Sequence, residues 1–185
     1  MVSNQGLGLL PAATDNTPAS ALPDVLADGL AVVFCGINPG LKAAATGHHF
    51  AGNGNRFWRA LHLAGFTPTL LRAENDADLL AHGCGLTTAV ARPTQRADQL
   101  SLQEFRDARS LLLQKIERHR PGWIAFLGKA AYAAISGQRQ VQWGCQSVLF
   151  GGANVWVLPN PSGLNRAFSL DDLAAAYKAL LLAMH

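Results

Sequence analysis

The chain has 185 residues and a formal net charge of +3, with 49% hydrophobic and 15% charged residues. This composition excludes an intrinsically disordered chain and is typical of one globular domain with a sizeable core. The mild positive charge permits contact with DNA phosphates but does not require it. No apolar stretch is long enough to span a membrane.

The three cysteines are Cys35, Cys84 and Cys145. Their wide spacing and odd number argue against a disulfide framework or a structural zinc, and an iron–sulfur cluster held by four cysteines is excluded. We therefore expect reduced thiols, a cytoplasmic location and no metal or cofactor.

Residues 1–22 are rich in Gly, Ala, Pro, Asn and Thr, and they predict a flexible leader before a single domain at residues 23–185. No Lys or Arg precedes the apolar residues of this leader, so it does not resemble a signal peptide. Residues 23–29 then predict a helical turn that Gly29 stops.

The apolar run from Ala31 to Cys35 predicts a strand buried on both faces. It continues into Gly36-Ile37-Asn38-Pro39-Gly40, whose turn-forming residues cannot prolong a strand. Because Pro39 restricts the backbone of Asn38, we expect that side chain on a stiff loop at the carboxyl end of the strand. Open α/β sheets place their binding sites at this edge.

A second buried strand, at residues 154–159, runs into Asn160-Pro161-Ser162-Gly163-Leu164-Asn165-Arg166. Two strands that each end in Asn-Pro predict two stiff loops at one edge of the same sheet.

The remaining pattern alternates strands with helices. Ser101 and Glu104 form a capping box for a helix at 101–118. Periodicity and turn signals also predict a long loop at 41–55, helices at 55–64, 76–82, 130–135 and 170–184, and strands at 85–88 and 123–127. This alternation predicts an α/β three-layer sandwich, in which helices cover both faces of a mostly parallel sheet.

The two Asn-Pro segments resemble the signature motifs of the mismatch-specific uracil/thymine-DNA glycosylases, a branch of the uracil-DNA glycosylase superfamily. Further family-like segments lie between them, at residues 46–50, 55–58, 92–94, 127–129 and 142–144. The resemblance covers residues 30–182 and implies a uracil-DNA glycosylase-like fold.

The resemblance implies a monomeric, monofunctional DNA glycosylase for base excision repair. Such an enzyme flips uracil opposite guanine out of double-stranded DNA and hydrolyses its N-glycosidic bond, which leaves an abasic site. Thymine and modified pyrimidines stay open as further substrates. Neither motif contains a lysine that could form a Schiff base, and Lys129 is the nearest candidate.

The resemblance assigns catalysis to Asn38, whose neutral amide can position a water but cannot deprotonate it. Backbone N–H groups of Ile37 and Gly40 would face the base. The efficient uracil-specific branch has Asp in place of Asn38 and Tyr in place of Gly40. The resemblance therefore implies slower chemistry here and a pocket that is open at position 5 of the base.

The second loop would fill the gap that a flipped base leaves. Leu164 resembles an apolar wedge, and Gly163 lets the backbone approach DNA. Asn165 and Arg166 would donate to the widowed guanine or a phosphate. Asn160 would support the base pocket, or a phosphate through Ser162, and we assign both residues to substrate binding. The alternative is an ordinary loop hydrophobe beside a solvated arginine.

Phe50 has two interpretations, as a core residue or as a stacking floor for the base. His48 and His49 have no carboxylate or cysteine at ligand spacing, so we expect pocket lining or phosphate contact there instead of a metal site. Ala43 and Thr88 depart from parts of the family, which leaves the details of base recognition open.

Asp98 is a second catalytic candidate, and the resemblance does not supply it. A carboxylate near the pocket would help a water attack the sugar or stabilise positive charge on it. The other carboxylates lie before a strand, in helix starts or on an exposed helix, whereas Asp98 lies in a loop with Arg92 and Arg96. The alternative is a solvated carboxylate that assists the start of the next helix.

Two other classes of function stay open. One is a non-catalytic module that binds mismatched or damaged DNA, because Asn replaces Asp in the first motif. The other is a hydrolase of small-molecule nucleotides or nucleosides on the same fold, which would have no use for a wedge at Leu164.

Overall fold

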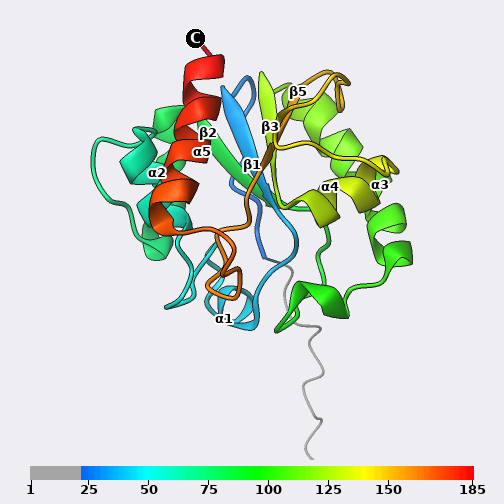
Figure 1. Ribbon diagram of the computed structural model, residues 1–185, viewed down its shortest axis with the longest axis horizontal. Helices are drawn as coiled ribbons and strands as arrows, with labels where there is room; N and C mark the ends of the chain where they lie inside the picture. The colour runs from blue at the N-terminus through cyan, green and yellow to red at the C-terminus, as the bar shows by residue number, and fades with distance from the viewer. Residues whose placement is uncertain (1–21) are drawn as a thin grey trace, which may run out of the picture.

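The computed structural model describes residues 22–185 and contains a five-stranded sheet with the strand order β2-β1-β3-β5-β4 (Figure 1). Strands β1, β2, β3 and β5 are parallel, and the short edge strand β4 is antiparallel to β5. The predicted α/β fold with a mostly parallel sheet is confirmed. The strands are β1 (Val32–Gly36), β2 (Cys84–Thr88), β3 (Trp123–Leu127), β4 (Gly144–Cys145) and β5 (Asn154–Leu158).

The helices lie on both faces of the sheet. They are α1 (Leu41–Thr46), α2 (Phe57–Ala64), α3 (Leu102–His119), α4 (Lys129–Ser136) and α5 (Leu170–Ala183), with 3-10 helices η1 (Ala73–His82) and η2 (Ala97–Gln99). Helices α2 and α5 pack on one face, while α3 and α4 pack on the other (Figure 1). The three-layer arrangement follows from this.

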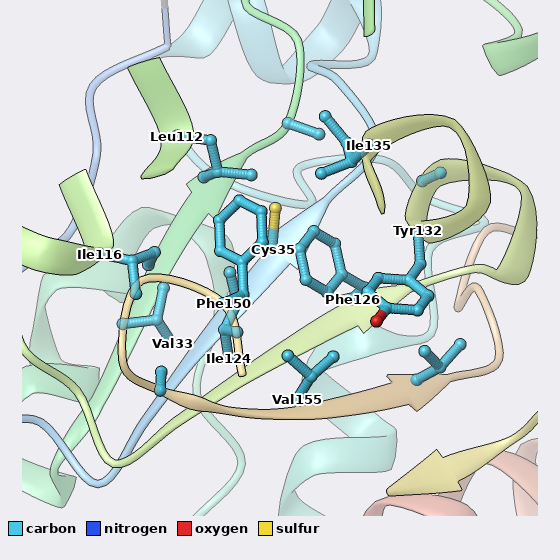
Figure 2. Close-up of a cluster of buried hydrophobic side chains, with 14 of the residues drawn as sticks. Val33, Cys35, Leu112, Ile116, Ile124, Phe126, Tyr132, Ile135, Phe150 and Val155 are labelled. Atoms are coloured by element: carbon cyan, nitrogen blue, oxygen red, sulfur yellow. The ribbon is translucent and has the colours of Figure 1, made fainter. Parts of the chain in front are cut away.

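Strand β1 divides the core into two halves because successive side chains of a strand point to opposite faces. Val33 and Cys35 point into the cluster under α3 and α4, which Figure 2 shows, and Val32 and Phe34 point into the cluster under α2 and α5. Every residue of β1 is buried. This double-sided burial explains why the strand contains no polar side chain.

The two Asn-Pro loops leave the sheet at the same edge. Strand β3 pairs in parallel with β1 on one side and with β5 on the other, so the carboxyl ends of all three strands lie together. Asn38 follows β1 and Asn160 follows β5. The sequence-based prediction that both loops share one edge is confirmed.

Two local predictions are wrong. Leu41–Thr46 forms helix α1 instead of the first part of a long loop, because its lysine and alanines favour a helix, which Gly47 ends with a φ of 75°. Residues 23–29 do not form a helical turn, since Val25 instead forms an antiparallel bridge with Leu86. The two backbone hydrogen bonds of this bridge are 2.9 and 2.8 Å long.

The capping box at Ser101 and Glu104 is confirmed at the start of α3. Helix α2 begins at Phe57, whose N–H donates to Asn55 Oδ1 over 3.0 Å. The predicted leader lies outside the described residues except for Leu22, which is buried. Within residues 22–185, none of the helices combines the length and the apolar character that crossing a bilayer requires.

Candidate active site

A cavity of about 170 Å³ opens at the carboxyl edge of the sheet, between the two Asn-Pro loops. Segments that are far apart in the sequence form its walls. Seven residues that the sequence analysis assigned to the site line this one cavity: Ile37, Asn38, Gly40, Phe50, Asn160, Ser162 and Leu164. Ala43 and Thr88, which depart from the family pattern, line it as well.

The Asn38 side chain is held in one orientation. Its Nδ2 donates to the carbonyl oxygen of Arg92 and to Thr94 Oγ1, each over 2.8 Å. Thr94 donates its own hydroxyl hydrogen to the carbonyl oxygen of Arg96 over 2.8 Å, so its oxygen remains an acceptor for Asn38. Because both partners accept, the amide cannot be flipped.

The orientation leaves Asn38 Oδ1 available. No group in residues 22–185 donates a hydrogen bond to this oxygen. An amide oxygen can accept a hydrogen from a water, and Asn38 lines the cavity. The arrangement is therefore suited to holding a water at one end of the cavity.

The segment that holds Asn38 is itself anchored to the start of α3. The Arg92 guanidinium donates to both carboxylate oxygens of Glu104, over 2.6 and 3.1 Å, and to the carbonyl oxygen of Gln99 over 2.9 Å. Glu104 also accepts from the backbone N–H of Ser101 over 2.8 Å. The bond from Arg92 and then the bond from Ser101 lower the pKa of Glu104 to about 2, so this carboxylate is ionised at neutral pH.

Phe50 forms a flat apolar wall of the cavity. Its ring stacks on Phe57 with centroids 4.0 Å apart and an angle of 22° between the ring planes. The ring also lies close to Gly36, where an added Cβ would lie 3.5 Å from Phe50 Cε1. Phe50 also has a φ of 57°, which is uncommon for a residue with a side chain. The uncommon backbone conformation therefore occurs at a residue that lines the cavity.

Several N–H groups of the second loop donate to side chains of the same loop. Ser162 N donates to Asn160 Oδ1 over 2.9 Å, and Leu164 N donates to Ser162 Oγ over 3.3 Å. Asn165 donates from Nδ2 to the carbonyl oxygen of Asn160 and accepts from Ala167 N. In this conformation both ends of the Asn165 amide form hydrogen bonds within the loop. The predicted contact of Asn165 with DNA stays a prediction.

Leu164 lies at the outer end of this loop with 70% of its surface exposed. Gly163 and Arg166 are exposed beside it. A leucine exposed to this degree contributes little to packing of the core. The position is compatible with the predicted wedge.

Arg56 is a residue of the site that the sequence analysis did not assign. Its side chain donates to four carbonyl oxygens of the second loop: those of Pro161 (3.3 Å), Ser162 (2.9 Å), Asn165 (2.7 Å) and Phe168 (2.6 Å). Thr94, which orients Asn38, was not assigned either. Both residues fall in segments that resemble the family, at 55–58 and 92–94, and this is the signal that could have indicated them.

Asp98 does not line the cavity, although its neighbours Arg96 and Ala97 do. Its side chain is 62% exposed and forms an ion pair with Arg96. The hydrogen bond from Arg96 lowers the pKa of Asp98 below its usual value. The predicted catalytic role of Asp98 stays a prediction.

Of the two histidines next to Phe50 in the sequence, His49 lines the cavity and His48 does not. His49 is buried, and its Nε2 lies 2.8 Å from the carbonyl oxygen of Pro23. Desolvation by burial lowers the pKa of His49. His48 lies 3.4 Å from Asp76 through its Nδ1. Within the described residues, no group of three or more His, Cys, Asp or Glu side chains could hold a metal ion.

The fold agrees with the comparisons to known proteins. The model of the Uracil DNA glycosylase superfamily matches residues 23–181, and the chain therefore belongs to this superfamily. The solution NMR structure of a proposed uracil DNA glycosylase from Methanosarcina acetivorans has a similar fold, with a TM-score of 0.57 and 21% sequence identity. The match covers 88% of this chain and 98% of that one. Membership of the superfamily supports a DNA glycosylase activity.

Proposed function

We propose that this protein is a monofunctional glycosylase of the mismatch-specific branch, which removes uracil opposite guanine from double-stranded DNA. The observation that carries the proposal is that one cavity is lined both by Asn38, whose Oδ1 accepts no hydrogen bond from residues 22–185, and by the exposed Leu164. A water-positioning amide and a wedge are the two parts that hydrolysis of a flipped-out base needs. We further propose that the protein acts as a monomer in the cytoplasm.

The chemical step is hydrolysis of the bond between the base and deoxyribose. Its transition state carries positive charge on the sugar and negative charge on the leaving base, by analogy with glycoside hydrolysis. Asn38 Oδ1 holds the attacking water, and backbone N–H groups of Ile37 and Gly40 donate to the base as it gains charge. The bonds to Arg92 and Thr94 keep the amide in place before the substrate arrives, so no reorganisation is needed in the transition state.

The base binds between Phe50 and the Asn160 loop. Stacking on an aromatic ring suits any base, so Phe50 provides affinity without selecting among pyrimidines. Selection at position 5 depends on Gly40, where an added Cβ would meet no atom within 4 Å. This open space accommodates a 5-methyl group, and we therefore include thymine among the substrates.

Leu164 occupies the gap in the base stack while the uracil lies in the cavity. Arg166, exposed on the same loop, donates to the widowed guanine or a phosphate. Gly163 allows the loop backbone to come close to DNA.

Water is the nucleophile, and no covalent intermediate forms. Lys129 has its Nζ 4.5 Å from the centroid of the Trp143 ring, in a cation–π contact. With its Nζ held against the ring, Lys129 is not placed to attack a sugar at the cavity, which it does not line. Lys42 lines the cavity, and its Nζ donates to Asn53 Oδ1 over 2.9 Å. The expected product is an abasic site with an intact strand.

The test is base release from a duplex with one G·U pair, followed by alkali to cleave any abasic site. We expect free uracil and strand breaks only after alkali. Strand breaks without alkali would support a Schiff base. Binding to the G·U duplex without release of uracil would instead support a non-catalytic mismatch-binding module, and release from free deoxyuridine alone would support a nucleoside hydrolase.

A further inference from the structure

The carbonyl groups of the second loop converge on Arg56. Side chains within the loop satisfy several of its N–H groups, whereas four of its carbonyl oxygens, at residues 161, 162, 165 and 168, accept from one guanidinium. The backbone N–H of Arg56 adds a fifth bond, of 3.0 Å, to Pro161. The loop is therefore wrapped around a side chain that comes from the start of α2.

A close backbone contact supports the same loop from a second side. A Cβ added to Gly163 would lie 2.6 Å from the carbonyl oxygen of Gly54, two residues before Arg56. Such a distance is too short for any side chain, so the two glycine backbones pack directly against each other. The segment at 54–56 thus holds the loop both by hydrogen bonds and by contact.

This arrangement determines where Leu164 points. The carbonyl groups face inward to the guanidinium, and Leu164, at the outer end of the loop, is left exposed. A wedge separates two stacked base pairs only if its loop keeps its conformation when the side chain enters the stack. Fixing a loop in its bound conformation beforehand lowers the cost of binding.

We propose that Arg56 is a positioning residue, which preorganises the loop at 160–168 so that Leu164 enters the base stack. The inference rests on the proposed function and adds a residue that does not line the base cavity. Lysine cannot replace Arg56, because an ammonium has three donors from one nitrogen and cannot reach four carbonyl groups along a loop.

The test measures insertion of Leu164 into a duplex that the protein cannot cleave. The probe is 2-aminopurine next to a non-cleavable 2′-fluoro-deoxyuridine opposite guanine, and its fluorescence rises when the stack opens. We expect Arg56→Lys to raise the protein concentration at half-maximal fluorescence about tenfold, as the loss of charged hydrogen bonds predicts. Arg109→Lys, at an exposed position on α3, is the matched control and should leave this concentration unchanged.

A double-mutant cycle shows whether Arg56→Lys weakens stack opening through Leu164. If Arg56 acts through the wedge, Arg56→Lys should cause no further loss in a Leu164→Ala background. Gly163→Ala should weaken the fluorescence response in the same way as Arg56→Lys. Gly52→Ala is its control on the neighbouring segment, because an added Cβ there lies 3.9 Å from its nearest neighbour.

Several outcomes would overturn the inference. These are a normal fluorescence response in Arg56→Lys, additive losses in the double mutant, or an equal loss of binding to single-stranded 2′-fluoro-uracil DNA, which a purely structural role would cause. Failure of the proposed function looks different. In that case the wild-type protein raises the fluorescence and Arg56→Lys does not, yet no uracil is released from the cleavable duplex.

Discussion

Asn38 donates a hydrogen bond of 2.8 Å to the hydroxyl oxygen of Thr94. The hydroxyl in turn donates to the backbone at Arg96, so it can only accept from the amide. Thr94, together with the Arg92 carbonyl that also accepts from Nδ2, therefore determines which end of the Asn38 side chain faces the cavity. An asparagine without such a partner could present its NH2 group to the water, which would then lack an acceptor.

Thr94→Val removes this hydroxyl while it keeps the shape of the side chain. We expect the single-turnover rate on a G·U duplex to fall about tenfold, since one hydrogen bond that orients the amide is lost. Binding of the duplex should not change. The control is Thr87→Val, which removes a buried hydroxyl that is bonded to Asp24 over 2.7 Å and does not line the cavity. A similar loss of rate in both variants would show that Thr94 acts only through stability.

Asn38→Ala should bind the G·U duplex almost normally and lose most of its cleavage activity, because the amide positions water and contributes little to affinity. A single-turnover rate like that of the wild type would exclude Asn38 from the mechanism.

Asn38→Asp should not accelerate the reaction, although the efficient branch carries Asp at this position. In this structure the amide NH2 faces two acceptors, at Arg92 and Thr94. A carboxylate would place an oxygen against the carbonyl group of Arg92, and we expect about tenfold slower cleavage at pH 7. Faster cleavage than in the wild type would show that the loop rearranges around the new charge.

Gly40→Tyr should make the pocket selective against a 5-methyl group. Gly40 has a φ of −69°, which any residue adopts, and the space around it is open. We expect release of thymine from a G·T duplex to fall about a hundredfold, while release of uracil falls less than tenfold, because a steric clash affects only the larger base. The ratio of the two rates measures the effect. An unchanged ratio would place the 5-position away from Gly40.

Asp98→Asn tests the catalytic role that the sequence analysis predicted for Asp98. We expect about a tenfold lower rate, at the low end of acid–base contributions, with unchanged binding. Because Arg96 lowers the pKa of Asp98, the carboxylate stays ionised, and the loss should be constant between about pH 5 and pH 9. Arg96→Gln removes the ion pair but keeps the Asp98 carboxylate, so it shows whether the carboxylate or the ion pair affects the rate. If Asp98→Asn cleaves at the same rate as the wild type at every pH, Asp98 has no catalytic role.

Glu104→Gln should reduce both stability and activity at neutral pH. The pKa of Glu104 falls from 4.5 to about 2 on folding, so the unfolded chain binds more protons between these values. The contribution of Glu104 to stability is therefore complete above pH 4.5 and disappears as the pH falls towards 2. The difference in Tm between the wild type and Glu104→Gln should shrink over this range. Asp172→Asn is the control, since that carboxylate completes a similar capping box at α5, away from Arg92.

The sequence predicted the parts of the site that are local in the chain. A buried strand followed by Asn-Pro places Asn38 and Asn160 at strand ends, whatever surrounds them. The capping box at Ser101 is local as well, since its partners are three residues apart. These features require only neighbouring residues, and the structure has them where the sequence indicates.

The features that sequence reasoning missed depend on partners that are distant in the chain. Arg56 and its carbonyl partners are more than a hundred residues apart, and an arginine before a helix is more often exposed. The bond from Asn38 to Thr94 likewise spans 56 residues. Helix α1 was missed because it has no capping side chain and only six residues. Strand β4 has two residues, too few for a periodic pattern.

The order of synthesis has a consequence for how the site matures. Asn38 and Arg56 leave the ribosome long before residues 160–168, and β5 has to enter the sheet beside β3 before that loop can reach the guanidinium. Until then one wall of the cavity is missing and Arg56 faces solvent. On the proposed function, stack opening and bond hydrolysis are thus acquired in one late step. A nascent chain that stops before β5 would then have the amide proposed to hold water without the loop proposed to expose a base to it.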